Sequence, residues 1–188
     1  MDVVVEPRKS PQPAGTSRLS GGEIQFSHGE SSLGLVLVAR KTRGICAVLL
    51  GDDFDALLQN VQERFPGSTL VEGGPDLDAL ADEISSFIES PAQRLDVPID
   101  LRGTDFQHLV WRALQEIPAG ETASYTEIAH RIGRPRAVRA VAQACAANPL
   151  AILVPCHRVV RSDGSLSGYR WGIERKRALL DREATARA

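Results

Sequence analysis

The stretch LAILVPCHRVV, residues 150–160, does most to decide the fold and the chemistry expected of this chain. Its first five residues form an apolar run that predicts a buried strand. A proline follows, and then Cys156 and His157, so a thiol and an imidazole should stand at the rim of a core. The thiolate is the nucleophilic form of cysteine, and a nearby imidazole raises the small thiolate fraction present at neutral pH. Taken alone, however, a cysteine beside a strand is more often a small buried hydrophobic residue.

Upstream of this stretch, the pattern predicts a pair of short helices. Ser124 and Glu127 form a capping box that opens the first helix. A tight turn at Gly133 follows, and Pro135 fits the first position of a second helix, residues 135–147. Two short helices joined through a glycine turn are typical of a helix-turn-helix.

The second helix of this pair carries mostly small side chains. Ala137 and Ala140 would let its backbone approach a narrow surface closely, while Arg134 and Arg136 cluster at its start. Alanines with one forward arginine, Arg139, suit the minor groove of DNA, where Arg139 would act as a wedge. An alanine-rich packing helix with a solvated basic edge explains the same residues equally well.

The remaining elements predict an α/β fold in two parts. Strands are expected at 22–27, 33–40 and 44–50 as an antiparallel meander, with helices at 53–65 and 76–89. The connection that follows has room for a short strand at 97–101. Further helices are expected at 105–116 and 173–184. We therefore expect a disordered tail at 1–19, an α/β domain at 20–97 and a helical domain with the helix-turn-helix at 98–188.

The charges are divided unequally between these two parts. Residues 1–100 carry 8 Lys and Arg against 16 Asp and Glu, whereas residues 101–188 carry 14 against 8. The net charges of −8 and +6 sum to the −2 of the whole chain. A basic half suggests a face that binds a polyanion, although an ordinary solvated surface would give the same count.

The three cysteines, Cys46, Cys145 and Cys156, indicate a reducing compartment. Their number is odd, and neither a C-x-x-C motif nor a zinc-like spacing occurs, so we expect no disulfide frame and no metal. Cys145 falls on the inward face of its helix and is expected to be a core residue. No secretory signal or membrane-spanning run is evident. These features predict a cytoplasmic protein that does not associate with a membrane.

Taken together, these residues resemble the O6-alkylguanine-DNA alkyltransferases, and most of all the C-terminal half of the family's Ada-type bacterial members. The resemblance rests on several motifs in order. They are GTDFQ at 103–107, PAGETASY at 118–125, RAVRAV at 136–141, NP at 148–149, PCHRVV at 155–160 and SGYRWG at 167–172. The resemblance implies a small ribonuclease-H-like antiparallel sheet with helices in the N-terminal part.

The resemblance also implies the chemistry of the site. Cys156 would be the alkyl acceptor, and His157 and Glu183 would form a Glu–His–water–Cys relay that deprotonates it. A water is expected because neighbouring side chains in an extended turn point apart. Tyr125 would protonate or hydrogen-bond the leaving guanine. The thioether formed has no leaving group, so each molecule would react once, without a cofactor.

Other positions would hold the substrate. Val159 and Tyr169 would frame the flipped base, and the backbone at Arg170 would donate to guanine O6. Asn148 would tie the recognition helix to the reactive turn, and Trp171 would occupy volume that a bulky alkyl group needs. The implied partner is double-stranded DNA containing O6-alkylguanine, bound by a monomer through its minor groove, with Arg139 filling the space that the base leaves.

Three other functions remain as alternatives. A non-catalytic module that binds damaged DNA would lack the acceptor cysteine, which is present here. A helix-turn-helix regulator would not need the PCHRVV motif. A Cys-His hydrolase would need an oxyanion site and a residue that orients the base.

Overall fold

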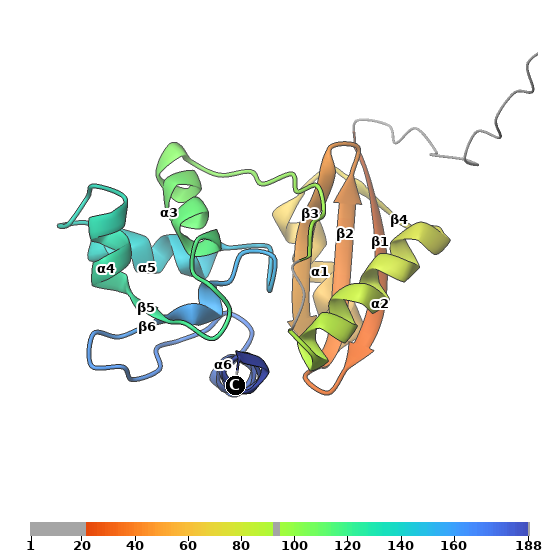
Figure 1. Ribbon diagram of the computed structural model, residues 1–188. Coiled ribbons are helices and arrows are strands. Elements are labelled where there is room, and N and C mark those ends of the chain that lie inside the picture. The colour runs from red at the N-terminus through yellow and green to blue at the C-terminus, as the bar shows by residue number, and fades with distance from the viewer. Residues whose placement is uncertain (1–21, 92–94, 188) are drawn as a thin grey trace, which may run out of the picture.

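The computed structural model describes residues 22–91 and 95–187, so the tail expected at 1–19 lies outside the described residues. Figure 1 shows two parts side by side, a sheet flanked by helices and a region built mainly of helices. The mixed α/β class is confirmed. No helix in the described ranges is long and apolar enough to cross a membrane.

The first part is built on a four-stranded sheet. Strands β1 (Glu23–Ser31), β2 (Gly34–Lys41) and β3 (Gly44–Gly51) pair as an antiparallel meander, which confirms the prediction. A short strand, β4 (Thr69–Glu72), pairs in parallel with β1 and was not predicted, so the order is β3-β2-β1-β4. Four partly exposed residues carry little periodicity, and the long-range pairing with β1 creates this strand.

Two helices cover the faces of this sheet (Figure 1). Helix α1 (Phe54–Arg64) begins after Asp53, whose carboxylate accepts from the backbone N–H of Ala56. Helix α2 (Pro75–Glu89) buries an apolar face, as its periodicity predicts. It packs tightly on β1 at Gly29, where a β-carbon would lie only 2.9 Å from a carbonyl oxygen of the helix.

The second part contains α3 (Asp105–Gln115), α4 (Tyr125–Arg131), α5 (Val138–Ala147) and α6 (Ile173–Arg187). The predicted capping box at Ser124 is confirmed, and Thr104 forms a second capping box, with Gln107, at the start of α3. The predicted start at Pro135 is wrong, because α5 begins three residues later. The N–H of Ala137 donates to the carbonyl of Arg134, so Pro135 occupies the second position of a turn, which its fixed φ suits equally well.

The apolar run 150–154 is not the predicted strand. Its backbone folds into turns, with Ile152 in the left-handed region at φ 68°, and only Leu150 forms a bridge, to Val48. The side chain of Asn148 causes this, because it takes up both the N–H and the carbonyl of Leu150. Apolar composition alone does not report such a local polar partner.

The reactive motif follows as one turn of 3-10 helix, η1 (Cys156–Arg158), instead of an extended segment. Strand β6 (Val159–Val160) comes next and pairs in parallel with β5 (Ala123–Ser124). The reactive motif therefore follows the turns of residues 150–154 in the chain, and its strand β6 pairs beside the start of α4.

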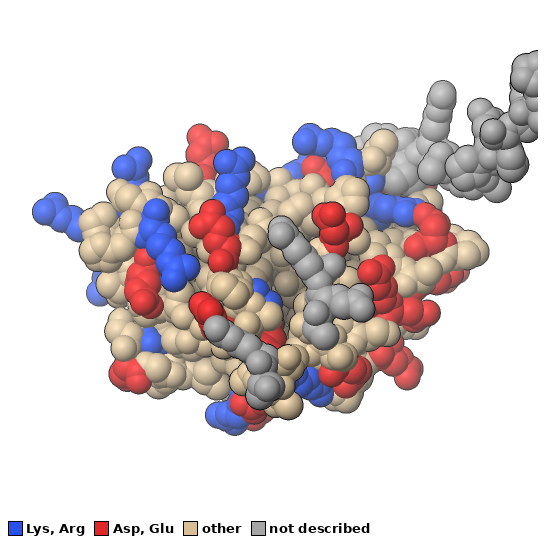
Figure 2. Space-filling view, viewed as in Figure 1, with Lys and Arg blue, Asp and Glu red and all other residues tan. Residues whose placement is uncertain are grey.

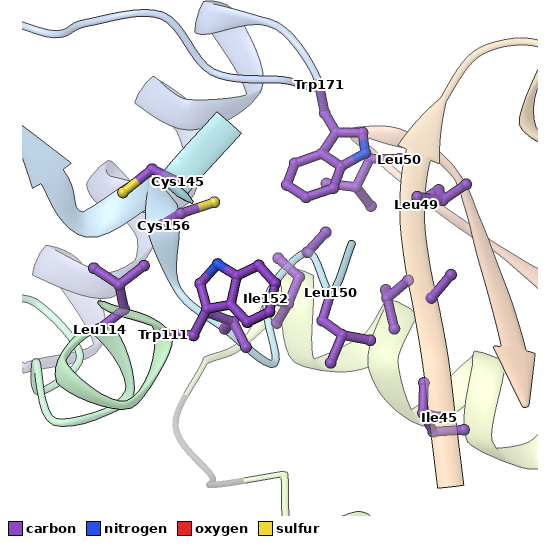
Figure 3. Close-up of a cluster of buried hydrophobic side chains, with 14 of the residues drawn as sticks. Ile45, Leu49, Leu50, Trp111, Leu114, Cys145, Leu150, Ile152, Cys156 and Trp171 are labelled. Atoms are coloured by element: carbon purple, nitrogen blue, oxygen red, sulfur yellow. The ribbon is translucent and has the colours of Figure 1, made fainter. Parts of the chain in front are cut away.

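Backbone hydrogen bonds to β3 join the two parts. The segment at 97–101 forms only one bridge, from Ile99 to Ile45, so the short strand considered there does not develop. Val48 donates to the carbonyl of Pro149 and accepts from the N–H of Ala151, both at 2.9 Å. Figure 3 shows the side chains that fill the space between β3 and the helices. The segment that leads to the reactive motif is thus fixed to the edge strand of the sheet.

Candidate active site

Cys156 is buried, with 4% of its surface exposed, in the turn η1 that packs against α3 and α6. Its sulfur lies 3.2 Å from Nδ2 of Asn148, which donates to it. Burial raises the pKa of the Cys156 thiol to about 11, against the smaller opposing effects of the Asn148 hydrogen bond and of the Lys176 charge. At pH 7, roughly one thiol in 10,000 is ionised at such a pKa, so the resting group is a neutral thiol that needs a base.

Asn148 lies between the end of α5 and the reactive motif. It is fully buried, and its amide donates to the carbonyls of Val154, at 2.8 Å, and Leu150, at 3.2 Å, as well as to the thiol. Its oxygen accepts from the N–H of Leu150 at 2.9 Å. The structure thus brings Asn148 to the place that its expected tying role requires.

His157 and Glu183 lie together, as expected. Nε2 of His157 is 2.9 Å from a carboxylate oxygen of Glu183, and both side chains are buried. Since the carboxylate accepts, Nε2 carries the proton and Nδ1 is left as an acceptor. Nδ1 is buried and has no hydrogen-bond partner among the described groups. No direct hydrogen bond joins His157 to Cys156 in the described part of the chain.

The sequence did not indicate the part played by Arg158. Its guanidinium binds Glu183 through Nε at 2.9 Å and Nη2 at 2.7 Å, and it also donates to the carbonyl of Ile117. A buried carboxylate needs a positive or hydrogen-bonding partner, and that rule applied to the whole PCHRVV motif would have found Arg158 beside His157.

The charges of this network follow from these contacts. Burial alone would raise the pKa of Glu183, but hydrogen bonds from His157 and Arg158 outweigh it and lower the pKa to about 2. Burial lowers the pKa of His157, against the opposing effect of Glu183. The resting network at neutral pH therefore holds an ionised Glu183 and a neutral imidazole, which is the form able to accept a proton.

Lys176 is a second buried group that the sequence analysis missed. Its ammonium donates to the carbonyl of Val159 and lies 3.3 Å from the hydroxyl of Ser167. Lys176 stands seven residues before Glu183 on α6, so the two share a face of the helix. In the sequence, this seven-residue spacing could have indicated that Lys176 faces the same site as Glu183.

The predicted base-binding residues surround the same region. The hydroxyl of Tyr125 lies 2.6 Å from that of Ser167, and Val159 is fully buried. The ring of Tyr169 lies 6.4 Å from that of His157, and its buried hydroxyl has no hydrogen-bond partner among the described groups. Trp171 packs at 5.1 Å against Tyr169, and Figure 3 shows its indole directed toward Leu50 of β3.

The side chains of the other predicted residues take no part in the thiol network. The Arg170 guanidinium is directed away from it, to the carbonyl of Ala146 and the side chain of Asn60. Arg134, Arg136 and Arg139 are exposed around the start of α5, and Ala137 and Ala140 are partly exposed there. Arg139 forms no hydrogen bond or ion pair with any described residue. These five positions form one surface with no part in the thiol network.

Helix α6 connects the network to the sheet. One face presents Lys176 and Glu183 to the reactive motif. The adjacent face uses Arg175, which binds the carbonyl of Leu33 and the carboxylate of Asp52, both at 2.6 Å. Arg182, one heptad further on, donates to the carbonyl of Ile88. The N-terminal part therefore helps to hold the helix that carries Glu183.

Comparisons with known proteins agree with this geometry. A family model described as 6-O-methylguanine DNA methyltransferase, DNA binding domain, matches residues 105–185. The inducible methylated-DNA–protein-cysteine methyltransferase of Bacillus subtilis is 46% identical over 81% of this chain and 80% of its own length. The bifunctional transcriptional activator/DNA repair enzyme Ada of Escherichia coli is 51% identical over 87% of this chain.

The chain spans about half the length of that Ada protein, 47%. Among solved structures, that of Mycobacterium tuberculosis OGT in complex with DNA is similar, with a TM-score of 0.72 and 36% identity. The match covers 87% of this chain and 94% of that one.

Proposed function

Because this chain belongs to the methylated-DNA–protein-cysteine methyltransferase family, we propose that it repairs O6-alkylguanine, mainly O6-methylguanine, in DNA. The alkyl group moves irreversibly to Cys156. The observation that carries this proposal is a buried thiol that Asn148 holds beside the His157–Glu183 pair. Nδ1 of His157 has no hydrogen-bond partner among the described groups and can accept a proton.

Deprotonation of the thiol is the first step. The imidazole of His157 takes the proton at Nδ1 through one water molecule, and Glu183 with Arg158 stabilises the imidazolium that forms. A water fits the relay because no direct bond joins the two side chains within the described residues. Lys176, close to the sulfur, favours the thiolate.

Alkyl transfer then occurs in one displacement. The sulfur forms a bond to the methyl carbon while the bond from that carbon to guanine O6 breaks. The leaving guanine takes up a proton from the hydroxyl of Tyr125, or from water while Tyr125 only hydrogen-bonds the base. The His157 imidazolium returns the thiol proton to water, which reprotonates Tyr125 where it has donated, so that the net reaction moves one proton from the thiol to the base. The backbone at Arg170 donates to O6, and Val159 and Tyr169 frame the base. Water does not remove the methyl group from the thioether, so the thiol is not regenerated and each protein molecule acts once.

The base must leave the duplex before it can reach the buried sulfur. We propose that α4 and α5 act as a helix-turn-helix whose second helix enters the minor groove of DNA. Ala137 and Ala140 permit close approach, Arg134 and Arg136 contact phosphates, and Arg139 replaces the flipped nucleotide. The sheet part would be ribonuclease-H-like, with a boundary near residue 97, and the protein would act as a monomer in the cytoplasm.

Substituting Arg139 by alanine should slow transfer from duplex DNA far more than reaction with the free base O6-methylguanine. A wedge contributes only when a base leaves its stack, a step that costs a few kcal/mol. The measurement compares second-order rates on both substrates for the variant and the wild type. Equal losses on the two would refute the wedge and leave Arg139 on an ordinary solvated edge.

Substituting Trp171 by glycine should increase sensitivity to free O6-benzylguanine without slowing transfer from O6-methylguanine. In the folded protein the indole packs on Tyr169, so removing it frees volume behind the ring that frames the base. The variant should also lose stability, by about 3 kcal/mol for a large buried aromatic. Titration with the inhibitor, followed by residual methyl transfer, tests this, and complete inactivation of the wild type at modest excess would contradict it.

The proposed function is tested on the DNA product. A duplex with a single O6-methylguanine is mixed with increasing amounts of protein, and restored guanine is counted after digestion. We expect one guanine restored per protein chain and no further turnover. A footprint confined to one undamaged sequence, without any restored guanine, would favour the regulator, and binding to damaged DNA alone would favour the non-catalytic module.

A further inference from the structure

A second pocket, of about 320 Å³, lies between the sheet and the end of α5. Three cationic side chains line it: Lys41 at the end of β2, Arg64 at the end of α1 and Arg102 before α3. The hydroxyl-bearing Ser68 is also part of its wall. Among the described residues that line the pocket, none is acidic. This pocket therefore gathers two cations of the net acidic half of the sequence, Lys41 and Arg64, with Arg102 of the basic half.

The three cations have no carboxylate partner of their own. None of the ion pairs in the described ranges includes Lys41, Arg64 or Arg102. The ammonium of Lys41 lies 4.0 Å above the Phe65 ring. The nearby carboxylate of Asp100 is 3.6 Å from Arg43 and does not line the pocket. Burial and then the charge of Arg102 lower the pKa of Lys41 by more than the Asp100 charge raises it, and no described carboxylate lines the pocket itself.

Arg64 carries an unsatisfied donor. Its Nε is buried and has no hydrogen-bond partner among the described groups, and its Nη1 reaches the carbonyl of Ala147 only at 3.4 Å. Only two other buried side-chain atoms in the described residues lack partners, and both belong to the reactive site, in His157 and Tyr169. A buried N–H without an acceptor lowers stability, so its presence points to a ligand.

The electrostatics agree with this geometry. Burial, followed by the charge of Arg170, lowers the pKa of Arg64. Burial, followed by the charge of Arg102, lowers the pKa of Lys41. The charged form of each group is therefore less stable in the pocket than in water. An anion bound between the two groups would stabilise their charged forms and raise both pKa values.

We propose that this pocket binds a phosphate group. Two guanidinium groups offer planar sets of donors, Lys41 offers a compact charge, and Ser68 offers a hydroxyl, which together match a tetrahedral oxyanion. Two sources present the same chemistry, a free phosphate and a phosphodiester of bound DNA. The site is separate from the alkyl-transfer centre. Binding of free phosphate does not rest on the proposed function, whereas binding of a DNA phosphodiester rests on the DNA binding proposed above.

The pocket nevertheless borders the segment that holds the thiol. Pro149 is part of its wall, and Arg64 reaches the carbonyl of Ala147. Asn148, between those two residues, donates to Cys156. A ligand in the pocket would thus lie against the segment 147–149, whose middle residue holds the thiol.

Equilibrium dialysis against radiolabelled inorganic phosphate at low salt tests the proposal on the full chain. The wild type should bind one phosphate saturably, and the Arg64→Gln and Arg102→Gln variants should bind it at least about tenfold more weakly, the loss expected for hydrogen bonds to a charged group. Arg177→Gln is the matched control, because Arg177 is an exposed cation on α6 paired with Glu174. It should bind phosphate like the wild type.

The salt dependence of DNA binding distinguishes the two sources. If a DNA phosphodiester occupies the pocket, the slope of log affinity against log salt should fall by about one in the Arg64→Gln and Arg102→Gln variants but not in Arg177→Gln. If only free phosphate binds, the slopes should agree. Absence of saturable phosphate binding, together with equal slopes in all variants, would overturn the proposal, whatever the methyl-transfer assay shows.

A measurement on the unaltered protein covers the case in which the variants fail to fold. Acetylation of Lys41, followed by peptide mass mapping, should slow when phosphate is added and should not slow with chloride at the same ionic strength. Equal acetylation rates in the two salts would contradict a phosphate at Lys41.

Discussion

The Cys156→Ser variant should transfer no detectable methyl group yet bind duplex DNA with the affinity of the wild type. A serine hydroxyl is far less acidic than a thiol, so the neutral imidazole of His157 cannot generate an alkoxide in its place. The surface around Arg139 is far from this substitution in sequence and shares no contact with the sulfur. Transfer of radiolabelled methyl and a gel-shift titration on the same preparation measure the two effects.

The other two cysteines provide the controls. Cys46 and Cys145 are buried, and burial raises the pKa of both thiols, that of Cys46 to about 11. Among the described residues, no histidine acts on either thiol. The Cys46→Ser and Cys145→Ser variants should therefore transfer methyl at the wild-type stoichiometry, apart from losses of stability. Label on either cysteine in the wild type would contradict the assignment.

The Glu183→Gln variant should show the next largest effect, a fall in the transfer rate of about 10²-fold or more. The amide cannot stabilise an imidazolium, and it leaves the Arg158 guanidinium without its buried counter-ion. We expect stability to fall by about 3 kcal/mol for that second reason. Single-turnover kinetics and urea unfolding measure the two losses separately.

A pH profile separates a role in the relay from a purely structural one. Without the relay, the thiolate arises only by titration of a thiol whose pKa is about 11, so the rate of the variant should rise about tenfold per pH unit between about pH 7 and pH 9. The wild-type rate should stay nearly flat there, because the neutral imidazole is already present. Glu174→Gln, a change to an exposed glutamate on the same helix, should match the wild type. A flat profile for Glu183→Gln would assign Glu183 to structure alone.

Acid should destabilise the folded protein through the same carboxylate. The pKa of Glu183 is lowered on folding from its ordinary 4.5 to about 2, so its contribution to stability is complete above about pH 4.5. That contribution is lost as the pH falls toward 2. The unfolding free energy of the wild type should therefore drop across this interval more steeply than that of Glu183→Gln, as measured by urea titrations at several pH values.

Much of the architecture could be predicted because it depends on local signals. The meander follows from alternating apolar residues between short turns, and the capping boxes at Thr104 and Ser124 fix where two helices begin. Strand β4 and the turn at 150–154 could not be predicted in this way. The first is created by pairing with β1, and the second by the Asn148 side chain.

Some residues of the site could likewise be predicted from the sequence, and others depend on contacts that form only on folding. Cys156, His157 and Glu183 were found through the resemblance of their motifs, and the structure brings the latter two within 2.9 Å. The contributions of Arg158 and Lys176 were missed because each depends on which buried group it faces after folding. Trp171 was expected beside the base, but its indole packs between Tyr169 and β3, so any effect on pocket size acts through Tyr169.

The distribution of charge on the surface also agrees with the sequence in part. Figure 2 shows acidic side chains gathered over the sheet part at the right, as the acidic half of the sequence predicts, whereas basic and acidic side chains are mixed over the helical part. Two cations of the second pocket, Lys41 and Arg64, run against that pattern because they belong to the acidic half, and they meet Arg102 of the basic half there. A count over each half of the chain could not reveal them, because they come from three separate segments that meet only on folding.

The intact mass of the protein after reaction with methylated duplex DNA tests the central claim most directly. We expect every reactive chain to gain one methyl group, and peptide mapping to place that group on Cys156 as a thioether. Loss of O6-methylguanine from the DNA without any gain in protein mass, or a methyl group on another residue, would contradict the account.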